Sequence, residues 1–487
     1  MNAAPIGLER LAAEVRRDLG CLNYPPADWL SAIASPDGTP LLDVLIVGGG
    51  MCGQTTAFAL LREGITNIRI IDRAPRGLEG PWATYARMET LRSPKHVIGP
   101  DLGVPSLTFR RWYEAQFGDE GWDALYKIPR LAWRDYLLWL RGVLALRIDN
   151  EIRLVSLKPE HDSVQAELAG PSGTEVIRAR RVVLAMGRDG SGAPRWPEFP
   201  SFDRRAAQGR VFHAADEIDF SSLAGARIGV LGAGATAFDN GATALEAGAA
   251  KVTLFARRPV LPQINKSKWA AFPGFQHGFV ALPDALRWRF LTYIQDEQVP
   301  PPHETVLRCD RHSGFSLRLG EPWLDLLAST SDVSVTTPLG TYRFDVAIIA
   351  TGFDIDLANR PEIAAFRDEI QLWRDHVTAD EANRFPEAAR NPYLGAGFEL
   401  LARDPGATSA LGRIHVFNGG STMSHGQLAG DIPGLATGAV RLAIAIARGL
   451  FVESSARLYA ALQAFDDREL EPTRYFVPVN RSSHPRP

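Results

Sequence analysis

Cysteine is scarce in this chain of 487 residues, and its scarcity excludes several kinds of protein. Cys21, Cys52 and Cys309 are too few and too widely spaced for a disulfide framework or a cysteine-rich zinc site. The sequence has no Cys-x-x-Cys pair, which excludes the redox-active dithiol of disulfide reductases. Cys52 lies within a glycine-rich turn, where we expect a small packing residue and not a nucleophile.

Excess charge and uninterrupted apolar runs are also lacking. A formal net charge of −3 gives no electrostatic reason to bind nucleic acid or an anionic membrane. The first 20 residues contain three acidic side chains, so they lack the apolar core of a signal peptide. Residues 435–452 form the most apolar later stretch, but two arginines interrupt it and make it a poor membrane span. We therefore expect a soluble, cytoplasmic protein without nucleic-acid or membrane partners.

The stretch that begins at residue 44 has the pattern of a dinucleotide-binding unit. Residues 44–47 are all apolar and predict a strand buried on both faces of a parallel sheet. Gly48, Gly50 and Gly53 then fit G-x-G-x-x-G, in which the first glycine permits the turn, the second admits a pyrophosphate and the third packs the helix. The next predicted strand ends at Asp72, close to the offset of an acid that binds a ribose.

The same pattern recurs at residue 226 with one change. After a second apolar strand, Gly232, Gly234 and Ala237 fit G-x-G-x-x-A, and the strand that follows ends in Arg257 and Arg258 in place of an acid. A carboxylate there would repel a 2′-phosphate, whereas the planar donor fork of arginine binds phosphate. The second site is therefore predicted to select NADPH, and the first suits FAD or NAD. The alternative is that these arginines only end a strand at the surface.

The rest of the chain alternates predicted strands and helices, which indicates an α/β fold of two Rossmann-like domains. Antiparallel strands are expected at 152–157, 163–168 and 175–179, parallel strands at 181–187 and 346–352, and long helices at 131–146 and 433–448. An irregular loop is expected at 75–113. We divide the chain into an N-terminal extension (1–40), an FAD domain (41–224 and 347–450), an inserted NADPH domain (225–346) and a C-terminal tail (451–487).

The order of the motifs resembles that of the single-component (class B) flavoprotein monooxygenases. The first fingerprint is followed by a Gly80-Pro81-Trp82 loop, an Ala-Met-Gly strand end at 185–187, the second fingerprint and an Ala-Thr-Gly strand end at 350–352. The resemblance covers roughly residues 41–450. It implies FAD in the first site, NADPH in the second, and a small soluble substrate that is oxygenated with O2.

Within that family, two stretches look like those of the amine and amino-acid N-hydroxylases. These are the segment from Arg92 to Lys95 and the segment from Gln263 to Asn265. The Baeyer–Villiger and flavin-containing groups carry F-x-G-x-x-x-H before the second fingerprint, but here Ala207 stands at the first position of that motif. His213 occupies its last position and is as well explained by a structural role. N-hydroxylation is therefore the first expectation.

The resemblance implies that NADPH reduces FAD, that oxygen adds at flavin C4a and that the resulting (hydro)peroxyflavin oxygenates the substrate. The protein positions the reactants and excludes water. The catalytic candidates are Gln54, Asn265 and Asp431. The cofactor-binding candidates are Gly48, Gly50, Gly53, Asp72, Trp82, Arg92, Gly232, Gly234, Ala237, Arg257, Arg258, Thr351 and Gly352.

Several other assignments stay open at this point. The chain could oxygenate a ketone or sulfide, pass electrons from NADPH through flavin to a partner protein, or bind nucleotides as a redox sensor. Charged residues near the predicted site, such as Lys268, either meet the substrate or lie on the solvated surface. His425 is a candidate pocket residue without an evident partner in the sequence. Assembly into a homo-oligomer also stays open.

Overall fold

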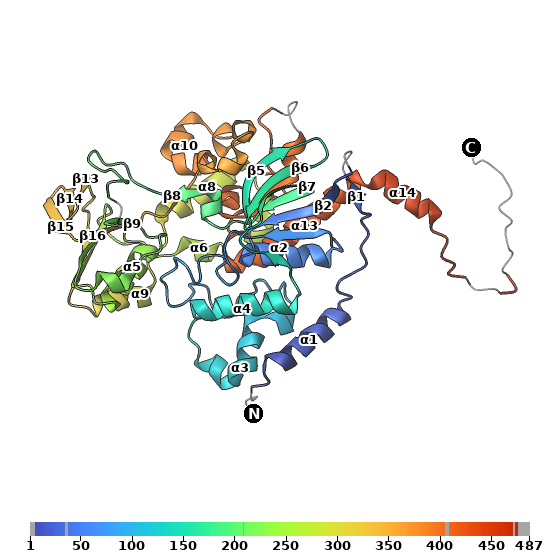
Figure 1. The fold of residues 1–487 in the computed structure, drawn as a ribbon, viewed down its shortest axis with the longest axis horizontal. Coiled ribbons are helices and arrows are strands. Elements are labelled where there is room, and N and C mark those ends of the chain that lie inside the picture. The colour runs from blue at the N-terminus through green and yellow to red at the C-terminus, as the bar shows by residue number, and fades with distance from the viewer. Residues whose placement is uncertain (1–4, 35–37, 208, 405–408, 471–472, 476–487) are drawn as a thin grey trace. The chain divides into compact units, whose positions relative to one another are not determined.

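The computed structural model describes residues 5–34, 38–207, 209–404, 409–470 and 473–475. Contacts divide the chain into a large unit, residues 1–447, and a small C-terminal unit, residues 448–487. The large unit contains two separate sheets built around parallel strands, with helices packed on them, so the predicted α/β class is confirmed (Figure 1). The predicted N-terminal extension (1–40) and C-terminal tail (451–487) lie partly outside the described residues.

The first sheet has eight strands and carries the first fingerprint. Its parallel part runs in the order β4 (Ile148–Asp149), β3 (Ile68–Ile71), β2 (Pro40–Val47), β7 (Gly173–Leu184) and β18 (Ile414–Val416). The antiparallel strands are β1 (Ile33–Ala34), β5 (Arg153–Pro159) and β6 (Val164–Gly170). The carboxyl end of β2, where residue 48 follows, therefore lies between the ends of β3 and β7.

Strand β7 corrects one prediction. Residues 175–179 and 181–187 were expected to form two strands, but residues 173–184 form one. Its first part pairs antiparallel with β6, and its second part pairs parallel with β2. The sequence pattern changes at residue 180 because the partner changes there, from an exposed hairpin to a sheet buried on both faces.

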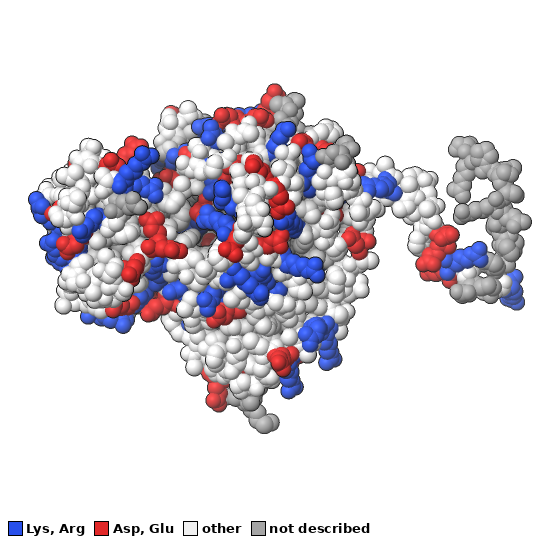
Figure 2. All heavy atoms as spheres, in the orientation of Figure 1, with Lys and Arg blue, Asp and Glu red and all other residues white. Residues whose placement is uncertain are grey.

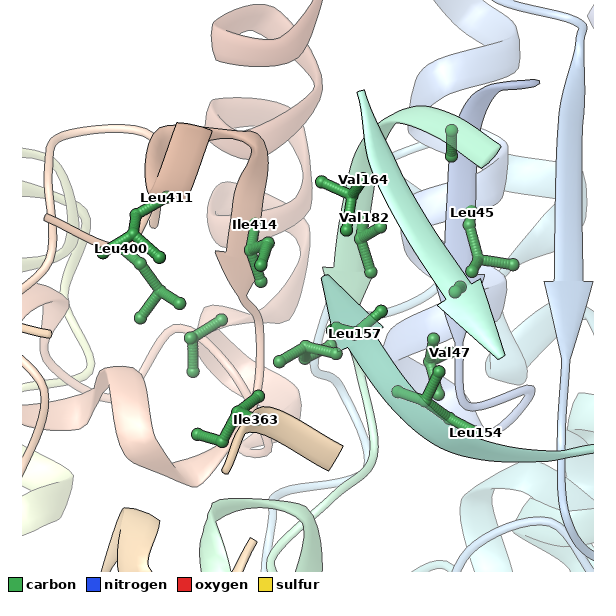
Figure 3. Close-up of a cluster of buried hydrophobic side chains, with 14 of the residues drawn as sticks. Leu45, Val47, Leu154, Leu157, Val164, Val182, Ile363, Leu400, Leu411 and Ile414 are labelled. Carbon is green, nitrogen blue, oxygen red and sulfur yellow. The ribbon is translucent and has the colours of Figure 1, made fainter. Parts of the chain in front are cut away.

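The core beside this sheet joins segments that are far apart in the sequence. Leu45 of β2 and Val182 of β7 belong to the same buried cluster as Leu157 of β5 (Figure 3). Residues from 363 to 416 complete the cluster, including Ile363 and Ile414. Strands β5 to β7 and residues 363–416 thus pack against β2, the first strand of the nucleotide-binding unit.

Five of the longer helices belong to the part of the chain that carries the first sheet. They are α1 (Leu8–Cys21), α2 (Met51–Arg62), α3 (Phe109–Ala124), α4 (Arg130–Val143) and α13 (Ile432–Glu453). The predicted apolar face of α1 is confirmed, with Leu11, Val15 and Leu19 buried. The prediction of an irregular loop through residue 113 was wrong at its end, because α3 begins at Phe109 and is interrupted only at Gly118, where φ is 70°.

Helix α13 is 22 residues long and apolar enough to cross a membrane by length and composition. Its buried face includes Leu435, Leu442 and Ile446, which are all 0% exposed. That face packs in the interior of the large unit, as a core helix of a globular protein does.

The second sheet repeats the design of the first. Five parallel strands run in the order β12 (Phe315–Leu319), β11 (Lys251–Ala256), β10 (Arg227–Leu231), β16 (Val346–Ile349) and β9 (Val211–His213). An antiparallel sheet follows, with β13 (Asp325–Ala328), β14 (Val333–Thr337) and β15 (Gly340–Phe344). Helix α5 (Ala235–Glu246) follows β10, and α9 (His303–Asp310) packs on α5 (Figure 1).

The remaining elements connect the two sheets or cover them. Strands β8 (Gly192–Pro194) and β17 (Phe353–Ile355) pair where the chain passes between the sheets. Among these elements, α8 (Asp284–Glu297) is a longer helix. The short helices are α6 (Lys266–Trp269), α7 (Pro273–Gly278), α10 (Ala379–Arg384), α11 (Pro386–Ala389) and α12 (Thr422–His425). The described part of the C-terminal unit contains α14 (Ser455–Ala464).

Candidate functional site

The three glycines after β2 form a cradle open on one side. A Cβ on Gly53 would lie 1.7 Å from the Gly48 carbonyl oxygen, and one on Gly48 would lie 2.4 Å from the Ala185 oxygen. A Cβ on Gly50 would approach no described atom closer than 3.8 Å. Gly48 and Gly53 are therefore required by packing, while Gly50 leaves space at the start of α2. A pyrophosphate fits this space because the first N–H groups of a helix are free to bind it.

Asp72 lies at the end of β3, beside the same cradle. Its carboxylate accepts hydrogen bonds of 2.7 Å from the N–H of Gly49 and of 2.7 Å from that of Ala74. Burial raises the pKa of Asp72, and these two bonds oppose the rise. Each carboxylate oxygen can still accept from a ribose hydroxyl. The geometry thus places Asp72 where the sequence predicts a ribose-binding acid.

Gln54 lies in the first turn of α2, after the cradle, and Asp431 lies near Cys52 of the same turn. The Gln54 amide donates to the Gly49 oxygen at 2.9 Å, while its buried Oε1 has no partner among the described residues. Burial raises the pKa of Cys52, in the same turn of α2, to about 11. Asp431 is close enough to add to that rise. The start of α13 therefore lies near the first turn of α2. The unpaired Gln54 oxygen can accept a hydrogen bond from a bound ligand, since buried polar atoms normally have a partner.

Trp82 lies in the loop that covers the cradle. Its ring meets Trp133 of α4 edge to face with centroids 6.4 Å apart, and its carbonyl oxygen accepts from Arg130. The ring is partly exposed, and its Nε1 would lie 3.6 Å from a Cβ on Gly80. A fixed, partly exposed aromatic ring beside the cradle can line one side of a planar cofactor.

The second cradle has the same division of roles. A Cβ on Gly232 would lie 2.6 Å from the Ala350 oxygen, so packing requires this glycine. Gly234 begins α5, is exposed, and has no described atom within 4 Å of its Cβ position. Ala237 is fully buried against the turn. The open N-terminus of α5 therefore fits a second pyrophosphate.

The two arginines after β11 differ in their surroundings. Arg258 donates to the Asp296 carbonyl oxygen at 2.8 Å. Arg257 is exposed and has no hydrogen-bond or ion-pair partner within the described ranges. Arg257 is therefore the better placed of the two to bind the 2′-phosphate of NADPH.

Thr351 and Gly352 lie where the chain leaves β16. The Thr351 hydroxyl donates to the Arg195 oxygen at 2.6 Å, and the Gly352 oxygen accepts from the Arg195 N–H at 2.9 Å. His213 is buried, and its Nε2 lies 3.1 Å from the same Gly352 oxygen. These residues fix the passage between the two sheets, so the contacts of His213 are structural.

A cavity of about 500 Å³ opens between the two halves of the large unit. Arg92 enters it from the loop after the first cradle, and Asn265 and Lys268 enter it from the segment after the second. The start of α9 supplies His303 and Glu304. We call it the Arg92 cavity, and its volume suits a small ligand. Its walls are Arg92, Tyr126, Lys127, Leu261, Pro262, Gln263, Asn265, Lys268, Val299, Pro300, Pro301, Pro302, His303, Glu304 and Val306.

The structure thus brings together Arg92 and Asn265, which are 173 positions apart in the chain by their numbers. Asn265 also begins α6, where its Oδ1 accepts from the Ser267 N–H at 3.0 Å. Its amide N–H2 group is left to meet a ligand. Gln54 and the glycines of the first cradle do not line this cavity.

Asp239 is a site residue that the sequence analysis missed. It lies in α5, is 4% exposed, and its Oδ2 is 4.0 Å from an Arg92 nitrogen. Burial raises the pKa of Asp239 to about 6, and the charge of Arg92 opposes the rise. Burial lowers the pKa of Arg92, which the carboxylates of Asp239 and Asp431 oppose. The sequence signal that could have identified it is that Asp239 is the one acidic residue in the otherwise uncharged stretch 237–240.

His425 is a packing residue in this structure. It is fully buried, stacks on Phe398 with centroids 3.8 Å apart, and has its Nε2 2.9 Å from the Gly395 oxygen. Burial lowers its pKa to about 3, so it stays neutral at physiological pH. It does not line the Arg92 cavity.

Lysine and arginine are interspersed with aspartate and glutamate over the face of the molecule seen in Figure 2. No broad region of one sign stands out on that face. A charged ligand would therefore be recognised by the local set of groups in a site and not by a general surface field.

Comparison with known proteins gives a family and a full-length relative. A family model described as FAD-NAD(P)-binding matches residues 45–189, which include the first cradle. The chain is 40% identical over 464 residues to an FAD-dependent urate hydroxylase of Xanthomonas campestris pv. campestris. That match covers 95% of this chain and 97% of the relative.

Solved structures share the fold at low identity. An ornithine N-hydroxylase of Kutzneria sp. 744, with reduced FAD, NADP⁺ and L-ornithine, matches with a TM-score of 0.65 and 16% identity over 84% of this chain and 100% of that one. A bacillithiol disulfide reductase of Bacillus cereus matches with a TM-score of 0.52 and 15% identity, over 84% and 99%. The same fold thus occurs with different activities, so the fold alone does not decide between them.

Proposed function

The chain belongs to the family of the FAD-dependent urate hydroxylase, and from that membership we propose that it is an FAD- and NADPH-dependent monooxygenase whose first candidate substrate is urate. The observation that carries the proposal is the Arg92 cavity, whose walls come from both nucleotide-binding halves. A flavin monooxygenase needs the nicotinamide to reach the flavin for hydride transfer and the substrate to reach the reduced flavin, so a substrate cavity is expected where the two halves join.

The residues of each cradle fit the cofactor proposed for it. Gly50 and the start of α2 would hold the FAD pyrophosphate, with Asp72 accepting from the ribose. Gly234 and the start of α5 would hold the NADPH pyrophosphate, with Arg257 on the 2′-phosphate. When bound, NADPH supplies a hydride and the reduced flavin supplies the activation of O2.

The chain's own part in the reaction is to orient and to exclude water. Gln54 offers its unpaired Oε1 to a hydrogen-bond donor beside the cradle. Arg92 and Asn265 would orient the substrate in the cavity. The Trp82 loop would close the site on one side, and exclusion of water protects reactive species from wasteful side reactions.

We also propose the domain division of an FAD domain interrupted by an NADPH domain. The separate second sheet supports the division, and the pairing of β9 with β16 supports an NADPH domain that begins upstream of residue 211. The buried face of α13 supports a soluble, cytoplasmic enzyme.

Oxygen uptake by the FAD-loaded protein tests the proposal. With NADPH in excess, urate should raise O2 consumption, and each urate consumed should match one NADPH oxidised. Catalase should change the uptake little, because little hydrogen peroxide is released when oxygen reaches the substrate. Uptake that is independent of every substrate tried, together with fast reduction of dyes or cytochromes, would favour the electron-transfer alternative.

N-hydroxylation of an amine or amino acid is the second candidate. Asn265 in the cavity wall supports it, because the sequence segment 263–265 resembles that of the N-hydroxylases. L-ornithine, L-lysine and cadaverine belong in the same oxygen-uptake screen, with a ketone and a sulfide as further probes. Coupled oxygen uptake with an amine and none with urate would make N-hydroxylation the first candidate in place of urate hydroxylation.

A further inference from the structure

The charges that line the Arg92 cavity are mostly positive. Arg92, Lys127 and Lys268 contribute three cations, and Glu304 is the one carboxylate in the described wall. Glu304 is already paired with Lys127 by a short ion pair. Arg92 and Lys268 are therefore left with charge that no wall carboxylate balances.

Arg92 is held from one side only. Its guanidinium lies 4.0 Å from the Asp239 carboxylate, while 43% of its side chain remains exposed. A guanidinium has five N–H donors in a planar fork, and a single carboxylate at this distance leaves several of them free. The free donors can meet a ligand in the cavity.

Asp239 of α5 is a buried carboxylate that lowers the stability of the fold. Its side chain is buried and its Oδ1 has no hydrogen-bond partner in the described part of the chain, while an Arg92 nitrogen lies 4.0 Å from its Oδ2. A buried carboxylate costs stability unless it is well paired. Ala235 and Ala242, four positions before and three after Asp239 on the same face of α5, are buried and show that an apolar side chain fits there.

We propose that Asp239 is a positioning residue that orients the Arg92 guanidinium, and that Arg92 with Lys268 selects an anionic substrate. This inference rests on the proposed function and names the substrate class for its site. The ligand is a small planar heterocycle or carboxylate with one negative charge and oxygen acceptors matching the arginine fork. Urate, a monoanion near neutral pH, belongs to this class, whereas a cationic amine would be repelled by both side chains.

Binding to the oxidised FAD-loaded protein tests the inference without turnover. Urate and L-ornithine are titrated separately, and the change in flavin fluorescence or absorbance gives each Kd. We expect urate to bind at least tenfold more tightly than L-ornithine. Equal affinities, or tighter binding of L-ornithine, would overturn the assignment of an anionic substrate.

Two variants test the positioning role. Arg92→Gln, at a partly exposed side chain that should not affect folding, should weaken urate binding about tenfold or more. Asp239→Asn should weaken it by a similar factor, and Asp239→Glu should restore part of it, while the KM for NADPH stays the same. An unchanged urate Kd in either variant would overturn the pairing.

Asp345→Asn is the matched control. Asp345 pairs with Arg227 at the opposite end of the second sheet, at an Nη2–Oδ1 distance of 2.9 Å, and does not line the cavity. We expect its urate Kd to equal that of the unmodified protein. The outcome is separable from the proposed function, because retained anion binding without coupled oxygen uptake would refute the monooxygenase activity and leave the anion site standing.

Discussion

At the scale of single residues, the contrast between Asp72 and Arg257 should decide which dinucleotide each half selects. Both follow the second strand of a βαβ unit, at β3 and β11 respectively. Asp72 is fixed by two backbone N–H groups, whereas Arg257 projects into solvent without a described partner. An acceptor suits a ribose hydroxyl, and a cation suits a phosphate.

Arg257→Ala should therefore raise the KM for NADPH by about tenfold, because a charge-assisted hydrogen bond contributes about 1.5 kcal/mol. The KM for NADH should change little, so the ratio of the KM for NADH to that for NADPH should fall by the same factor. Steady-state oxidation of both nucleotides measures this. Arg258→Ala is the control and should have a smaller effect, since Arg258 is already bonded to Asp296. Equal losses with NADH and NADPH would contradict the 2′-phosphate assignment.

Asp239 should give the fold a pH dependence of definite sign. Burial raises its pKa from the ordinary 3.8 to about 6, so as the pH falls the native state takes up a proton before the unfolded state does. The cost of the buried carboxylate is present above pH 6 and is lost as the pH falls toward 4. The charged groups that affect Asp239 include Arg92 from the loop, Arg130 at the start of α4, and Arg308 and Glu304 from α9.

The Asp239→Asn variant cannot titrate at this position. The difference in free energy of unfolding, variant minus unmodified protein, should therefore decrease between pH 7 and pH 4.5. Urea unfolding of both FAD-loaded proteins across this range measures the difference. A constant difference would show that Asp239 has an ordinary pKa in the folded protein.

At the scale of elements, the glycine turns show which parts of a motif serve packing and which serve the ligand. Gly53→Ala should destabilise the fold by at least about 3 kcal/mol, because its Cβ would overlap the Gly48 oxygen. Gly50→Ala should fold, because its Cβ meets no described atom within 3.8 Å, but should bind FAD more weakly. Thermal unfolding and the flavin content of the purified protein separate the two effects. A stable, flavin-free Gly53→Ala protein would contradict this division.

The strands and cradles could be predicted from the sequence because their signals are local. The apolar run 44–47, the glycine spacing and Asp72 lie within one βαβ unit, and the structure places them as expected. The division of residues 175–187 into two strands was wrong because it depends on a change of sheet partner, which is not encoded locally. The start of α3 was missed because it is rich in aromatic residues, which are weaker helix formers and give no clear helical pattern in the sequence.

The cavity was predictable only in part. Arg92 and Asn265 were identified through a family resemblance, but nothing in the sequence shows that they share a wall with Lys127 and Glu304. Asp239 was missed because its importance comes from its approach to Arg92, more than a hundred positions away. Long-range pairs of this kind depend on how the two halves pack.

At the scale of the whole molecule, the two halves should respond to their cofactors separately. A ligand that binds only the folded state stabilises it by about 2.7 kcal/mol at a concentration one hundred times its Kd. FAD should therefore raise the Tm of the flavin-free protein, and NADP⁺ should raise it further. The first cradle explains the first increase, and the cradle before α5 explains the second.

The two increases can be assigned by variants. In Gly50→Ala, the increase with FAD should shrink while the increase with NADP⁺ persists, and in Arg257→Ala the reverse should hold. Differential scanning fluorimetry of flavin-free protein, with each ligand alone and with both, gives the four values needed. If either variant lost both increases, the cradles would not act as independent sites, and the assignment of FAD to the first half and NADPH to the second would fail. If each variant lost only its own, one chain would hold the hydride donor and the flavin on separate sheets, with the Arg92 cavity between them.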